Sequence, residues 1–111
     1  MKSASLAQIR KELKTLSREE VADLCEKLIK YKRDNKELLN YLLFESVDED
    51  SYVEAIKQDV SEAFSATNTS GFYLAKKSIR RALRIANKYI KYSDQPETEL
   101  DVLLHFCEEL K

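Results

Sequence analysis

The residues best suited to binding chemistry are seven lysines and arginines that share one stretch without an acidic residue. Residues 71–93 hold all seven, which gives this segment a charge of +7. At 100° per residue on a helix, six of them fall within an arc of roughly 100°. We name these six residues the basic stripe: Lys77, Arg80, Arg81, Arg84, Lys88 and Lys91. Arginine can hold phosphate oxygens through two parallel N–H groups, so the stripe is suited to binding phosphates or an acidic partner.

The acidic segments on either side of the stripe allow a second interpretation. Residues 45–70 have a charge of −6, from seven acids and Lys57, and residues 94–111 have a charge of −5, from six acids and Lys111. The cations could therefore face solvent, or pair with carboxylates on neighbouring helices at little gain in stability. A binding face and a solvated or ion-paired face both stay open from the sequence.

Catalytic chemistry has less support. His105 is the only histidine, and Asp101 and Glu109 each lie four residues from it on one helical side. One imidazole with two carboxylates lacks the spacing of a strong metal site, and an exposed histidine between such neighbours is the ordinary interpretation. No serine lies in an elbow motif, and one glycine cannot form a glycine-rich phosphate loop. We therefore expect no catalytic residue, no metal, no cofactor and no enzymatic activity.

The elements that position these residues are predicted to be helices. Gly71 and Pro96 are the only residues of their types among 111, so the chain lacks the turns of a many-stranded sheet, while helix formers are abundant. We expect one all-α domain over residues 1–111, with six helices in an array of hairpins or an irregular bundle. A short helix capped by Ser3 or Ser5 is expected first. Further helices are expected near 18–32, 35–45, 49–66 and 72–92, then a loop-separated last helix capped by Asp94, with another loop at 67–71.

The stretch from Leu16 to Phe44 has the densest apolar pattern and is predicted to form a helical hairpin. Ser17 and Glu20 have the spacing of a capping box. Residues 38–44 are apolar on most sides, which is typical of a surrounded helix, so we place them at the centre of the core. Ten residues are expected to be buried: Leu24, Leu28, Leu38, Leu42, Ile56, Val60, Ile79, Leu83, Leu100 and Leu103.

Residues 1–15 contain no continuous apolar run, so we expect neither a signal peptide nor a membrane span, and a cytoplasmic protein. Cys25 and Cys107 are expected to be small buried side chains without a disulfide. The net charge of −1 gives no global reason to bind nucleic acid or a membrane.

Three segments resemble a family of small bacterial helical proteins of unknown function: ELKTLSREEV (12–21), NKELLNYLLFES (35–46) and FYLAKKSIRRAL (72–83). The resemblance covers most of the chain and implies an all-helical protein with no assigned active site. The N-terminal part is also similar to DNA-binding SAP modules, through LxxIRKEL (6–13) and LSREEVADLCEKLI (16–29). The turn between these segments is KTLS, where SAP modules have a glycine.

The sequence thus predicts an interaction module that is not an enzyme, with a protein partner or a second copy of the chain as its ligand. The opposite charges of neighbouring segments favour docking to a complementary surface. The alternative is sequence-independent binding of nucleic acid phosphates by the basic stripe.

Overall fold

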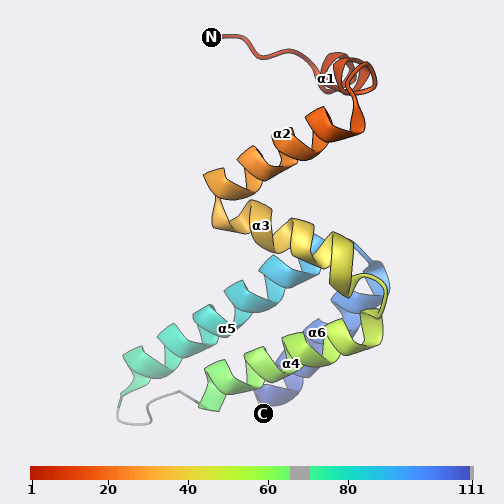
Figure 1. Cartoon of the computed structure of the whole chain (residues 1–111). Helices are drawn as coiled ribbons and strands as arrows, with labels where there is room; N and C mark the ends of the chain where they lie inside the picture. The colour runs from red at the N-terminus through yellow and green to blue at the C-terminus, as the bar shows by residue number, and fades with distance from the viewer. Residues whose placement is uncertain (66–70, 111) are drawn as a thin grey trace. The chain divides into compact units, whose positions relative to one another are not determined.

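A computed structural model describes residues 1–65 and 71–110, and their regular structure is entirely helical. In this part of the chain there are six α-helices, one short π-helix and no strand, and 84% of the described residues are helical (Figure 1). The all-α fold is therefore confirmed. The elements are α1 (Leu6–Leu13), α2 (Arg18–Tyr31), α3 (Arg33–Asn40), the π-helix η1 (Tyr41–Glu45), α4 (Glu49–Ser65), α5 (Phe72–Ser93) and α6 (Pro96–Glu109).

Local capping determines where the first two helices begin. The hydroxyls of Ser5 and Ser17 each accept a hydrogen bond from the backbone N–H three residues on. In return, the side chains of Gln8 and Glu20 accept from the backbone N–H groups of the two serines. These are two complete capping boxes. The start predicted at Ser17 is confirmed, and Ser5 is the residue that caps α1.

The start of α6 differs from the prediction. Pro96 lies in the first turn, as expected, but the capping position belongs to Gln95 and not to Asp94. Asp94 instead ends α5 with a left-handed backbone (φ 54°), and its N–H donates to the carbonyl of Ile90. Aspartate tolerates this conformation better than most residues, so it serves as a C-terminal cap. Of the loop predicted at 67–71, residues 67–70 lie outside the described residues.

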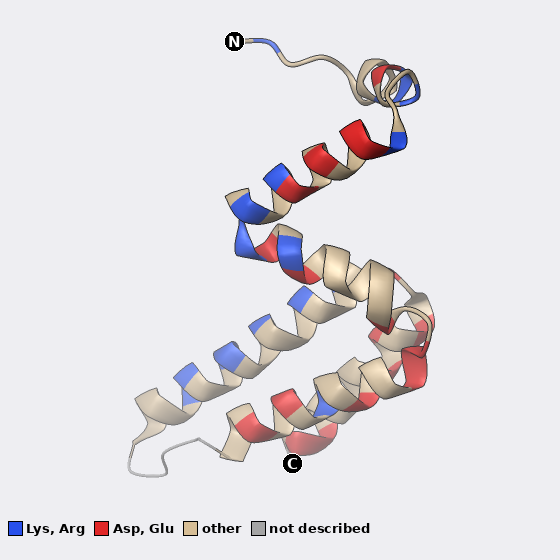
Figure 2. Ribbon diagram, in the orientation of Figure 1, with Lys and Arg blue, Asp and Glu red and all other residues tan. Residues whose placement is uncertain are grey.

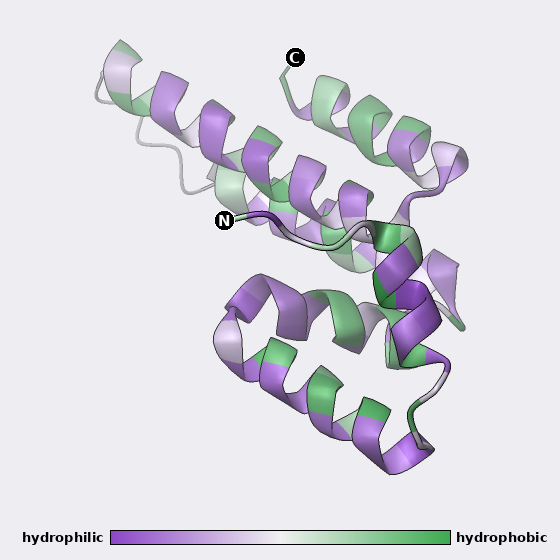
Figure 3. Ribbon diagram, turned by 90° about the horizontal axis from the view of Figure 1, so that it is seen from above, coloured by the Kyte–Doolittle hydropathy of each residue, from purple (hydrophilic) through white to green (hydrophobic). Residues whose placement is uncertain are grey.

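The chain divides into two compact units, and the first is Met1–Leu39. None of the described residues in α1, α2 and α3 is buried. The Asn35 side-chain amide donates to the carbonyl of Leu28 over 2.8 Å, which ties α3 to the end of α2. Hydrophobic and hydrophilic positions alternate along the α2 ribbon in Figure 3. Caps and local hydrogen bonds therefore hold this unit more than a core does.

The second unit, Asn40–Lys111, is built on a three-helix bundle. The helices α4, α5 and α6 pack against one another in all three pairs, and α5 runs back along α4 in Figure 1. Val60, Ala82, Ala86 and Val102 are wholly buried. Short side chains at such contacts let helix axes approach closely. Every buried residue in the described part of the chain belongs to this unit.

The core is not centred where the sequence analysis placed it. Within residues 38–44 only Tyr41 is buried, at 3% exposure. Ile56 and Val60 are buried as predicted, and Ile79 and Leu103 pack against the core half-buried. The other six predicted core residues are exposed: Leu24, Leu28, Leu38, Leu42, Leu83 and Leu100. The physical reason is that α4, α5 and α6 fill the core with their own side chains, so η1 contributes one residue at its edge.

Among the described residues, no helix combines the length and the apolar character that crossing a membrane requires. Cys25 is half-buried, Cys107 is exposed, and both are free thiols. The burial predicted for Cys107 is therefore wrong.

Candidate functional site

The basic stripe lies on the side of α5 that is opposite its buried side. Ala82, Ala86 and Ile90 of α5 belong to the core, and at 100° per residue the stripe lies about 180° from them. Five of its six residues are exposed. The sixth, Lys88, is half-buried, with its ammonium nitrogen 4.8 Å from the centre of the Tyr89 ring. Cations follow α5 without an acidic residue on this helix (Figure 2). The fold thus brings the six predicted residues onto one helix face.

Salt bridges do not account for the stripe. Across residues 1–65 and 71–110, none of the salt bridges involves the five exposed members of the stripe. Lys57 on α4 behaves differently, because its ammonium nitrogen lies 2.8 Å from the Asp101 carboxylate and 3.7 Å from that of Glu54. The hydrogen bond to Asp101 raises the pKa of Lys57. The ion-paired interpretation therefore has no support for these five cations, which face solvent.

Carboxylates border the stripe on both sides. Towards α4, Asp59 and Glu62 line a groove of about 350 Å³ together with Arg81. Towards α6, Glu99 and Lys91 line a hollow of about 200 Å³. The cationic surface is therefore about one helix wide, with carboxylates of α4 beside it and Glu99 of α6 at its end near Lys91.

An exposed aromatic ring extends the stripe at the start of α5. Tyr73 lies one turn before Lys77 on the same arc of the helix, and its side chain is 74% exposed. An aromatic face in line with cations can stack on a base while the cations contact phosphates.

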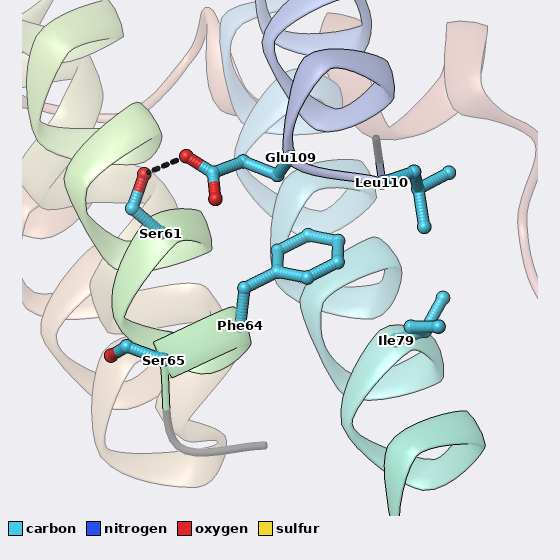
Figure 4. A pocket seen from close by; sticks show the side chains of 6 residues that line it. All are labelled: Ser61, Phe64, Ser65, Ile79, Glu109 and Leu110. Carbon is cyan, nitrogen blue, oxygen red and sulfur yellow. Dashed lines mark hydrogen bonds between the residues drawn. The ribbon is translucent and has the colours of Figure 1, made fainter. Parts of the chain in front are cut away.

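His105 belongs to a polar cluster that the sequence analysis missed. Its Nε2 lies 2.9 Å from the hydroxyl oxygen of Ser61 and 3.6 Å from the carboxylate of Glu109. The Ser61 hydroxyl donates to Glu109 over 2.9 Å (Figure 4). The His105 side chain is only 22% exposed, so the exposed histidine predicted from the sequence is wrong. These contacts fasten α6 to α4.

A hollow of about 390 Å³ opens beside this cluster (Figure 4). Its lining residues are Ser61, Phe64, Ser65, Ile79, Glu109 and Leu110. In a catalytic triad the carboxylate orients the histidine through its second ring nitrogen. Here the carboxylate instead accepts the proton of the serine hydroxyl, so the contacts do not prepare Ser61 as a nucleophile. No group of metal ligands occurs among the described residues, and Asp101 is engaged by Lys57.

Glu49, in the first turn of α4, forms a second polar cluster. The Tyr41 hydroxyl donates to its Oε1 over 2.7 Å, and the hydroxyls of Ser93 and Thr98 donate to its Oε2. Partial burial alone raises the pKa of this carboxyl, but the three hydrogen bonds together bring it below the usual value. One anion thereby joins η1, α4, the end of α5 and the first turn of α6.

Comparison of the chain with protein-family models, with curated proteins and with solved structures gives no match.

Proposed function

We propose that the chain is a non-enzymatic interaction module that associates with a second copy of itself through an apolar surface on and after η1. The observation that carries this proposal is the exposure of four large apolar side chains within six residues. Leu42, Leu43, Phe44 and Val47 are 54%, 58%, 69% and 83% exposed, and we name them the η1 surface. Clustered exposed apolar residues on a folded unit mark interaction sites.

A buried neighbour holds the η1 surface in place. The ring centre of Tyr41 lies 4.5 Å from that of Tyr52 in the core, and its hydroxyl bonds to Glu49. A surface that is already ordered loses less conformational entropy on binding. Single turns of π-helix are frequent at functional sites, which is consistent with this placement.

The size of the η1 surface predicts weak association. Four partly exposed side chains supply roughly 400 Å², about half of the roughly 800 Å² per partner in a standard interface. The opposite charges of α5 and of the segments beside it would orient two copies without adding much affinity. We therefore expect a transient, concentration-dependent dimer. We also place the protein in the cytoplasm, where its two free thiols would stay reduced.

Sedimentation velocity across the micromolar concentration range tests this proposal. The wild-type chain should shift towards a dimer as concentration rises, and Phe44→Glu should stay monomeric. Leu104→Glu is the matched control, because it places the same charge at a 55% exposed leucine on α6. It should dimerise like the wild type, and far-ultraviolet circular dichroism should show that both variants fold. The proposal is overturned if the wild type stays monomeric, or if both variants lose dimerisation equally.

We propose a second function for the basic stripe, the sequence-independent binding of nucleic acid phosphates. It is supported by the five exposed cations that have no salt bridge within the described residues. Binding of this kind releases counterions, so log K should fall with log salt by about 0.7 per phosphate on single strands and 0.9 on duplex.

Retention of mixed-sequence oligonucleotides at about 50 mM salt tests this second function. The triple variant Arg80→Gln, Arg81→Gln, Arg84→Gln should weaken binding to all sequences alike and flatten the salt dependence. Lys11→Gln, Lys14→Gln, Lys27→Gln removes the same charge from exposed positions of the first unit and should change binding little. If the wild type retains no nucleic acid, or both triple variants lose binding equally, the stripe is not the site.

A further inference from the structure

We infer that the basic stripe selects a single polynucleotide strand over a duplex, with Tyr73 stacking on a base at its end. This inference rests on the phosphate-binding function proposed above. It deepens that function by naming the form of nucleic acid that the surface of α5 can accept.

The width of the cationic surface is the first argument. Asp59 and Glu62 line the groove along its α4 edge, and Glu99 lines the hollow at its α6 side near Lys91, where the stripe ends. A single strand has one row of phosphates, which can follow α5 between these carboxylates. The stripe runs from Lys77 to Lys91, 14 residue steps or about 21 Å at 1.5 Å per step, so several consecutive phosphates can be met.

A duplex meets the same edges unfavourably. A helix that enters the major groove has phosphates on both sides of it, across a groove about 12 Å wide. Here α4 packs along α5 and presents Asp59 and Glu62 beside the stripe, while Glu99 of α6 lies beside its last residue, Lys91. A duplex laid across α5 would bring its second row of phosphates towards Asp59, Glu62 or Glu99, where like charges repel.

The exposed ring of Tyr73 is the second argument. Stacking needs an open base face, which a single strand offers and a paired duplex does not. Tyr73 is 74% exposed and in line with the cations. A strand whose phosphates follow the stripe can therefore turn one base onto this ring.

Fluorescence anisotropy with the full chain tests the inference, with an oligothymidylate and a duplex of equal length at the same low salt. The single strand should bind more tightly by at least about fivefold, which is the effect of one weak stacking contact. With about four phosphate contacts, its log–log salt slope should be near −2.8. Tyr73→Ala should weaken single-strand binding by at least about fivefold and leave the salt slope and the duplex affinity unchanged. Tyr31→Ala is the control, because it removes a similarly exposed tyrosine (82%) from α2, a helix of the other unit, and it should bind like the wild type.

Each other outcome has a definite meaning. If the single strand and the duplex bind with equal affinity, and the triple glutamine variant binds neither, phosphate binding is upheld. The preference for a single strand is then overturned. If inorganic polyphosphate binds as tightly as the oligothymidylate, and Tyr73→Ala weakens neither, then stacking of a base on Tyr73 is overturned. Binding to neither polymer overturns the inference together with the phosphate-binding function.

Discussion

At the scale of the single residue, Glu49 holds the second unit together through three hydroxyl donors. A carboxylate can accept all three hydrogen bonds. A glutamine amide offers one oxygen and a donating nitrogen, so Glu49→Gln leaves at least one hydroxyl without an acceptor. We expect this variant to lose about 1–3 kcal/mol in the free energy of unfolding, measured by urea unfolding at neutral pH. Asp50→Asn, at the exposed neighbouring position, should change stability little.

The same carboxylate predicts a pH dependence. The pKa of Glu49 is lower in the folded chain than its ordinary value of 4.5. Its stabilising effect is therefore fully present above that ordinary value and is lost as the pH falls through the lowered, folded pKa. The urea midpoint of the wild type should fall over this acidic range more than that of Glu49→Gln. Exposed acids such as Glu20 and Asp48, whose pKa values are also lowered, contribute to both curves. Parallel curves would mean that Glu49 is not the titrating group.

The cluster around His105 could have been predicted from the sequence only by knowing how α4 and α6 are aligned side by side. Lys57 with Asp101, and Ser61 with His105, are both separated by 44 residues in sequence. On each helix the two positions are four residues apart, so one alignment of α4 beside α6 produces both contacts. A single helical pattern cannot reveal that alignment. For this reason the sequence analysis found Asp101, His105 and Glu109 but not their partner Ser61.

At the scale of the element, the core lies in α4, α5 and α6. Substitutions in these helices should therefore lower the free energy of unfolding more than substitutions in η1. Ile56 is 2% exposed and Leu42 is 54% exposed. Ile56→Ala should cost about 2–5 kcal/mol because it leaves a cavity in the core. Leu42→Ala should cost less than about 1 kcal/mol, as do most exposed substitutions. Urea unfolding of the two variants measures both costs. A larger loss for Leu42→Ala would mean that η1 is covered in the folded chain.

The residues at which the helices begin and end were largely predictable from the sequence. The exposure of most of η1 was not. Capping at Ser17 depends on Glu20 three residues away, so a local pattern suffices. Burial depends on which helices supply the opposite surface. An apolar stretch such as 38–44 is compatible with a central helix and with an exposed one, and only the packing of α4, α5 and α6 decides. The basic stripe was predictable because helical periodicity alone places its residues together.

At the scale of the whole molecule, the two units should differ in their ability to fold alone. The unit Asn40–Lys111 contains every buried residue of the described chain. The α-helices of the first unit have 8, 14 and 8 residues, and isolated helices shorter than about 12–15 residues are marginal in water. We expect a fragment of residues 40–111 to unfold cooperatively in urea, and a fragment of residues 1–39 to show weak helicity without a cooperative transition.

The full chain provides the comparison for these fragments. Its main urea transition should have nearly the same midpoint as that of fragment 40–111, because the core is the same. A fragment 40–111 that has lost its cooperative transition would show that the first unit contributes to that core.

The separation of charge between α5 and the two helices packed against it makes the second unit an electric dipole. The cations lie along α5, while the segments that contain α4 and α6 have charges of −6 and −5. A charged body approaching this unit is drawn to one side and repelled from the other before any contact forms. At about 0.1 M salt this bias extends over a Debye length of roughly 10 Å. The docking proposed above should therefore be faster at low salt, where this bias orients the approach, than at high salt, where the bias is screened.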